Sequence, residues 1–123
     1  MENINSVVVS GNLTRDAELR VTQGGMNILS FTIASNERRK NADGGWEDCP
    51  NFIDCKLFGK RASALERYLT KGSKVVVCGK LRYSEWESDG HRRSKLEVMA
   101  NSVEFTTKDG GKREEYASED LPF

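Results

Sequence analysis

Apolar and polar residues alternate along most of the chain, which is the pattern typical of β-strands. Side chains of a strand point in turn to its two faces, so every second residue shares a face. Leu29, Phe31 and Ile33 show this alternation clearly. We predict five strands, the first with a short continuation over 18–21 after a bend near Arg15. The five strands cover residues 7–13, 26–35, 46–58, 73–86 and 91–105.

Glycines, aspartates and one proline mark where these strands turn or change. A polar loop over 36–45 ends in the turn sequence Asp-Gly-Gly, and Asp89-Gly90 predicts a hairpin turn. Pro50 interrupts the early part of the third strand, and Gly79 indicates a β-bulge in the fourth.

One short helix is predicted between the third and fourth strands. Ala62, Leu65 and Leu69 recur at helical spacing within residues 61–69, and Gly72 supplies a stop. The order is then three strands, one helix and two strands. This is the plan of the OB-fold, so we predict an all-β chain built on a five-stranded OB-fold barrel.

The periodic pattern stops near residue 105. We expect residues 1–105 to form the barrel, 106–118 a short flexible linker and 119–123 a separate tip, with the tail disordered. Residues 114–123 contain four acidic residues and neither Lys nor Arg. The whole chain has 19 basic and 19 acidic residues, so residues 1–113 carry 19 basic and 15 acidic groups, a balance of +4. A mildly basic domain therefore precedes an acidic tail.

The third strand has an unusual second face. One face is apolar and is expected to meet the core, through Ile53, Cys55 and Leu57. The face expected to meet solvent carries two aromatic rings, an acid and a lysine: Phe52, Asp54, Lys56 and Phe58.

The fourth strand repeats this mixture of basic and aromatic side chains. Its inward face is expected to hold Val75, Val77, Gly79, Leu81 and Tyr83, and its outward face Lys80, Arg82, Ser84 and Trp86. The returning strand places Leu96, Val98 and Ala100 in phase on the core side. Each tryptophan also lies near a basic cluster: Trp46 follows Arg38, Arg39 and Lys40, and Trp86 precedes Arg92, Arg93 and Lys95.

Exposed rings beside cations favour the binding of a single-stranded nucleic acid. Bases stack on the rings and Lys and Arg neutralise phosphates, whereas a duplex hides its base faces. The single helix has an apolar stripe destined for packing, so no recognition helix is predicted. The expected stacking residues are Phe52, Phe58, Trp86 and Trp46. The expected phosphate contacts are Arg15, Arg38, Lys56, Lys80, Arg82, Arg92 and Arg93. The alternative is that the rings pack under a loop or in a subunit interface and that the lysines only solvate or protect strands.

Enzymatic, metal-dependent and membrane functions are not indicated. The one histidine, His91, has no clustered Cys or Asp partner, and Gly59-Lys60 lacks the frame of a P-loop. Three cysteines without a C-x-x-C spacing indicate buried thiols rather than a metal site or a disulfide, so we expect no metal and no cofactor. There is no signal-peptide pattern and no run of roughly 18 apolar residues. We expect a non-enzymatic protein of the cytoplasm.

The terminal segment "EDLPF" is a second candidate site. An apolar end can enter a pocket while acidic groups meet its basic rim. The partner-binding residues would be Glu119, Asp120, Leu121, Pro122 and Phe123. On pattern alone, a frayed end without a role is the favoured interpretation of these residues.

The sequence resembles the bacterial single-stranded DNA-binding protein (SSB) family. The resemblance rests on "VVVSGNLTRDAELR" (7–20), "FGKRASALERYLTKGSKVVVCGKLR" (58–82), Trp86 and the terminal "EDLPF". It implies an OB-fold that assembles as a homotetramer, wraps single-stranded DNA, associates with the nucleoid, and recruits replication, repair and recombination proteins through its tip. It thus favours a binding role for the tip. Family stacking positions fall on Phe52, Phe58 and Trp86. A further family aromatic falls on Arg38, so one stacking site is weakened unless Trp46 compensates.

Two other functions remain open from the sequence. One is a protein-interaction adaptor of the primosomal OB type, with feeble affinity for single strands. The other is single-stranded RNA binding, as in cold-shock domains, although nothing in the sequence obviously recognises a 2′-hydroxyl.

Overall fold

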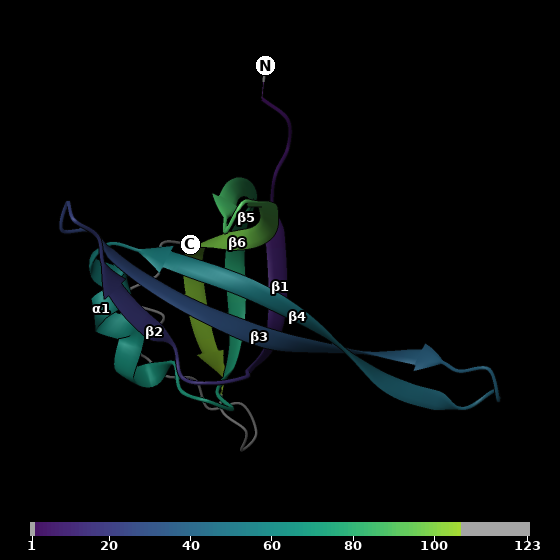
Figure 1. Cartoon of the computed structure of the whole chain (residues 1–123). Helices are drawn as coiled ribbons and strands as arrows, with labels where there is room; N and C mark the ends of the chain where they lie inside the picture. The colour runs from purple at the N-terminus through teal and green to yellow at the C-terminus, as the bar shows by residue number, and fades with distance from the viewer. Residues whose placement is uncertain (1, 107–123) are drawn as a thin grey trace.

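Strands form most of the chain in this computed structural model, which describes residues 2–106 (Figure 1). In chain order the elements are β1 (Val7–Leu13), β2 (Glu18–Val21), β3 (Asn27–Lys40), β4 (Trp46–Phe58), helix α1 (Lys60–Leu65), the 3₁₀ turn η1 (Glu66–Tyr68), β5 (Lys74–Ser88) and β6 (His91–Thr106).

Five of the strands close into a barrel. They are bonded in the order β1, β5, β6, β4, β3, and the pairing of β1 with β3 completes the ring. The pairing of β4 with β6 is parallel and the other pairings are antiparallel. β2 follows β1 after a bend and pairs with β3. This arrangement confirms the predicted OB-fold, with the helix between β4 and β5 because the continuation of the first strand is counted as β2.

The core is built from the inward faces that the alternation predicts. The strands contribute Leu29, Phe31, Ile33, Cys55, Leu57, Val75, Val77, Val98, Val103 and Phe105. Ala62, Leu65 and Leu69 are also fully buried, because their spacing of three and four residues places them on one side of the helix and its extension. Burial of one such leucine stabilises the fold by about 1.5–3 kcal/mol.

Two predicted boundaries are wrong. Residues 36–40 belong to β3 rather than to a loop, since the ladder with β4 continues to the pair Lys40 and Trp46. Only the turn over 41–45 remains, where Asn41 Oδ1 accepts the backbone N–H groups of Asp43 and Gly45. The β3–β4 hairpin therefore extends well beyond the barrel (Figure 1). The helix is shorter than predicted: α1 ends at Leu65 and continues only as η1.

The predicted bulge at Gly79 is confirmed, and it alters the second half of β5. The register of β5 against β6 shifts between Cys78 and Gly79. Leu81, Tyr83 and Leu96 were expected to face the core, but all three are exposed, Tyr83 by 59%. The physical reason is that the β5–β6 hairpin projects beyond the bulge, where no second layer covers it within residues 2–106.

Candidate nucleic-acid interface

The second face of β4 lies on the outside of the barrel, between β3 and β6. Ile28, Ser30, Thr32 and Ala34 of β3 pair with Phe58, Lys56, Asp54 and Phe52 of β4. On the other side Lys56 is paired with Met99 of β6. β5 continues the surface, because Lys80 is paired with Met99 and Arg82 with Glu97. We call this surface the outer face. Its defining residues are Phe52, Asp54, Lys56, Phe58, Lys80, Arg82 and Glu97.

Three of the predicted stacking residues are exposed and one, Phe58, is partly buried. Phe52 is 68% exposed and Trp86 is 44% exposed. Phe58 is half-buried and lines a hollow. Phe52 and Phe58 are six residues apart on one strand, which places them about 20 Å from each other. The two phenylalanines thus stand on the same side of the strand with polar residues between them.

The fourth predicted stacking residue lies apart from the others. Trp46 is exposed and is paired with Lys40 near the tip of the β3–β4 hairpin. Trp86 is paired with Arg93 on the β5–β6 hairpin. Phe58 therefore lies on the barrel itself, whereas the two tryptophans lie on the projecting hairpins.

Three cations gather beside Phe58. Lys80 and Arg82, both predicted as phosphate contacts, line the same hollow as Phe58, of about 380 Å³. Arg61 also lines it and was not predicted. Its position on the first turn of α1 is fixed by burial of its neighbour Ala62, and its guanidinium donates to the backbone carbonyl of Asn101. No sequence pattern relates Arg61 to β5, so its position beside Lys80 and Arg82 is known only from the fold.

A second basic hollow lies on the opposite side of β4. It measures about 350 Å³ and is lined by four cations and one acid: Arg15, Arg20, Lys56, Lys95 and Glu18. Arg15 and Lys56 were predicted as phosphate contacts, whereas Arg20 and Lys95 were not. Arg20 lies 3.6 Å from Glu18 on the same strand.

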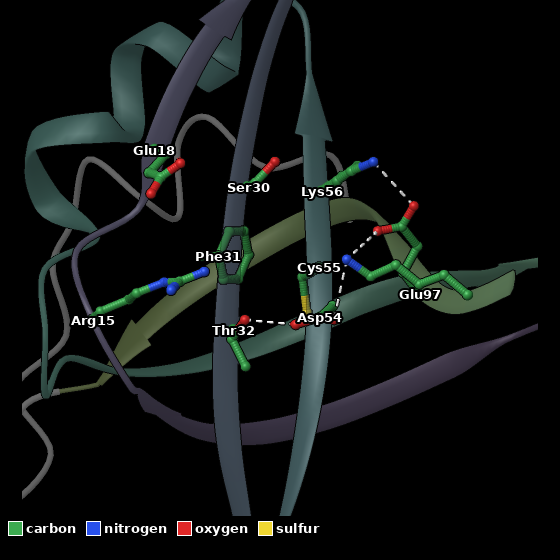
Figure 2. Close-up of a pocket in the computed structure, with 10 residues that line it drawn as sticks. Arg15, Glu18, Ser30, Phe31, Thr32, Asp54, Cys55, Lys56 and Glu97 are labelled. Atoms are coloured by element: carbon green, nitrogen blue, oxygen red, sulfur yellow. Dashed lines mark hydrogen bonds and ion pairs between the residues drawn. The ribbon is translucent and has the colours of Figure 1, made fainter. Parts of the chain in front are cut away.

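Ion pairs link the two lysines of this second hollow to acidic residues of β4 and β6 (Figure 2). Lys56 Nζ lies 3.1 Å from Glu97 Oε1, and Lys95 Nζ lies 3.2 Å from Asp54 Oδ2 and 3.6 Å from Glu97 Oε2. Thr32 donates its hydroxyl to Asp54 Oδ1 at 2.6 Å. Lys56, predicted as a phosphate contact, is thus already paired.

The hydrogen bond and the lysine also affect the ionisation of Asp54. The Thr32 hydroxyl, followed by the Lys95 ammonium, holds the pKa of Asp54 below its ordinary value, although partial burial acts in the opposite direction. Asp54 is therefore a carboxylate at neutral pH.

The remaining predicted phosphate contacts lie on the hairpins. Arg38 is 3.9 Å from Asp48 on the β3–β4 hairpin, and Arg92 is 3.4 Å from Glu85 on the β5–β6 hairpin. Both pairs are exposed, and exposed pairs are weak and easily exchanged. Arg93 stands beside Trp86 in the register.

Other kinds of site would depend on the cysteines, the acidic residues and the helix within residues 2–106. No group of three or more His, Cys, Asp or Glu side chains gathers there as a metal site. The cysteines are free thiols, and burial raises the pKa of the Cys55 thiol to about 12, which keeps it protonated. Across the same residues, no helix has the length and apolar character that a membrane span requires.

Residues 4–106 match the Single-strand binding protein family. The chain belongs to this family. The matched range contains the whole barrel, both hairpins and every residue of the outer face.

Curated relatives are similar over most of this chain. A Single-stranded DNA-binding protein from Borreliella burgdorferi is 46% identical over 107 residues, which cover 85% of this chain and 71% of the relative. One from Treponema pallidum is 44% identical over 105 residues, 85% of this chain and 59% of the relative. One from Wolinella succinogenes is 39% identical over 117 residues, 94% of this chain and 72% of the relative. The chain thus spans between 59% and 72% of these proteins.

Solved structures share the fold. A deletion mutant of the single-stranded DNA binding protein from Thermus aquaticus aligns with a TM-score of 0.77 at 30% identity, over 88% of this chain and 53% of that one. The Plasmodium falciparum SSB, solved in complex with ssDNA, aligns with a TM-score of 0.78 at 18% identity, over 87% of this chain and 98% of that one. At that identity the second likeness concerns the fold alone.

Proposed function

We propose that this protein binds single-stranded DNA without sequence preference, and that it coats and protects exposed strands during replication, recombination and repair. One observation carries the proposal: open aromatic rings and basic side chains share the outer face. Phe58, Lys80 and Arg82 line one hollow, and Phe52 is exposed on the same face of β4. Membership of the family and the names of the relatives support it.

Stacking and phosphate neutralisation together account for sequence-independent binding. Every base has a π-face, and stacking on an aromatic side chain contributes roughly 1–3 kcal/mol per base. Phe52, Phe58 and Trp86 would provide this, with Trp46 as a further platform at the end of its hairpin. Cations neutralise the backbone regardless of sequence. The function is binding, and we propose no reaction.

The phosphate contacts divide into unpaired and paired cations. Among residues 2–106, no ion pair within 4.0 Å includes Arg15, Lys80, Arg82 or Arg93, so these are immediately available. Arg38 and Arg92 would exchange a weak surface partner for phosphate. Among the predicted phosphate contacts, Lys56 has the most buried ion-pair partner, Glu97.

A homotetramer is proposed as the working assembly. Val7 and Val9 of β1 pack against the core, whereas Val8 between them is 71% exposed, so the tetramer would cover the outer side of this strand. Four chains of 13.8 kDa would give a particle of about 55 kDa. Light scattering at micromolar concentration measures this mass directly, and a value near that of one chain would remove the tetramer from the proposal.

The tip, residues 119–123, lies outside the described residues. We propose that it recruits replication, repair and recombination proteins, with Leu121 and Phe123 entering a pocket and Glu119 and Asp120 meeting its rim. A chain truncated after residue 118 is expected to keep its affinity for DNA and to lose these partners. With these roles we propose that the protein acts in the cytoplasm, at the nucleoid.

A competition experiment tests the proposed function against its rivals. The full chain is titrated with fluorescently labelled oligo-dT, and bound label is displaced with unlabelled oligo-dT or oligo-U of equal length. We expect tight binding and preferential displacement by oligo-dT. Better displacement by oligo-U would favour an RNA-binding protein, and no binding at low salt would favour a partner-docking adaptor.

A further inference from the structure

A buried carboxylate stands in the middle of the outer face. Glu97 of β6 is only 5% exposed, although it lies between Arg82, its partner in the register, and Lys56, its partner in an ion pair. Its Oε2 atom is buried without a hydrogen-bond partner and is 3.6 Å from Lys95 Nζ. An acid is unexpected at the centre of a surface that binds an anion.

The carboxylate is one of four charged groups that ion pairs link together. Lys56 contacts Glu97, and Lys95 bridges Glu97 and Asp54. We call these four residues the charge ladder; it consists of Asp54, Lys56, Lys95 and Glu97. Two ammonium groups and two carboxylates cancel, so the charge ladder has no net charge (Figure 2).

Basic residues flank the charge ladder on both sides. Arg61, Lys80 and Arg82 line the hollow next to Phe58. Arg15 and Arg20 line the other hollow, together with Lys56 and Lys95 of the charge ladder itself. In the strand order, the charge ladder on β4 and β6 is a neutral strip between two basic edges, one with Lys80 and Arg82 of β5 and the other with Arg20 of β2. Phe52 and Phe58 stand on β4, within this strip.

We propose that Asp54 and Glu97 are internal counter-ions that withhold Lys56 and Lys95 from DNA phosphates. The single-stranded DNA would then bind through its phosphates at the two basic edges, while its uncharged bases lie over the neutral strip between the phenylalanines. This inference rests on the proposed function and specifies which cations of the same surface contact the backbone.

The burial of Glu97 supports this division. A charge removed from water must keep its partner, because loss of one partner leaves an uncompensated buried charge. A phosphate at the surface could attract Lys56 only by uncovering Glu97. Lys80 and Arg82 have no such ion-pair partner within residues 2–106 and can bind phosphate without this penalty.

The first test removes a counter-ion and looks for a gain of binding. Asp54→Asn keeps the hydrogen-bonding shape and leaves the charge ladder with one surplus positive charge. Each phosphate contact to a single strand adds about 0.7 to the slope of log K against log salt. We expect Asp54→Asn to steepen the slope for labelled oligo-dT by about 0.7, so that its advantage over wild type grows about threefold from 200 to 50 mM salt. Glu97→Gln should act in the same direction.

A matched control separates this effect from net charge. Glu66→Gln removes the same charge from the exposed η1 turn, outside the outer face, and should leave the slope unchanged. Because misfolding does not produce tighter binding, a gain in Asp54→Asn cannot be a folding artefact. An unchanged slope in Asp54→Asn would overturn the inference.

A second test compares two lysines. Lys80→Met should lower the slope by about 0.7, whereas the double variant Lys56→Met/Glu97→Gln, which removes both members of the ion pair and leaves no uncompensated buried charge, should change it by much less. An equal loss in both variants would overturn the inference and leave the proposed function intact. Failure of wild-type protein to bind oligo-dT would instead overturn the proposed function.

Discussion

Trp86 is the aromatic side chain whose substitution tests base stacking. It is open to solvent and paired in the register with Arg93, so a base could meet the ring while its phosphate meets a cation. Trp86→Ala is expected to cost roughly 1–3 kcal/mol of binding to oligo-dT, measured by fluorescence anisotropy. Trp46→Ala, at the end of the other hairpin, is the comparison and should cost less. Equal affinity of Trp86→Ala and wild type would contradict the stacking role.

The contacts of Asp54 predict how the free energy of unfolding changes at acid pH. Its pKa is lower in the folded chain than in the unfolded one, so its ionised form stabilises the fold above the unfolded value. That contribution is lost as pH falls from about 4 through the folded pKa. In urea unfolding at pH 6 and pH 3, wild type should lose more stability than Asp54→Asn. An equal loss in both proteins would show that the contacts with Thr32 and Lys95 contribute nothing.

The sequence predicts the burial of some residues but not the contacts of others. Alternation predicted that Phe52 is exposed and that Cys55 and Leu57 are buried, because β4 has the core on one side over this stretch. It could not predict that Lys56 meets Glu97. That contact depends on the parallel pairing of β4 with β6, two strands far apart in the chain, which no local pattern specifies.

In the β5–β6 hairpin, apolar alternation no longer indicates burial beyond the bulge at Gly79. Gly79 indicated the bulge, and the bulge is present. The apolar residues beyond it were still assigned to the core, because periodicity does not show where a strand leaves the barrel. Tyr83 and Leu96 instead face each other across the hairpin, exposed.

Gly79 also allows β5 and β6 to approach closely. A Cβ atom at this position would lie 2.1 Å from the Met99 carbonyl oxygen, and backbone atoms cannot move aside cheaply. Gly79→Ala should lower stability by about 2 kcal/mol, seen as a fall in Tm of roughly 10 °C. Gly24→Ala, whose nearest atom is 3.9 Å away in an exposed turn, is the control. A Tm unchanged in both variants would contradict the need for glycine in the bulge.

The molecule as a whole combines a barrel with two projecting hairpins and an acidic terminal segment. The order of the strands and the helix along the chain and the mild basic charge of residues 1–113 could be predicted from the sequence, because each depends on local pattern or on counting. The hollows beside Phe58 and beside Arg15 could not, since each joins segments brought together only when the barrel closes. The function proposed depends on that closure.

Titration of the full chain with oligo-dT at several salt concentrations, with tryptophan fluorescence as the signal, tests the proposed binding surface most directly. Stacking predicts quenching of tryptophan emission on binding. Four or five phosphate contacts predict that log K falls with log salt with a slope of about −3 or steeper. Binding that neither quenches tryptophan nor weakens with salt would contradict a surface of open rings and basic edges.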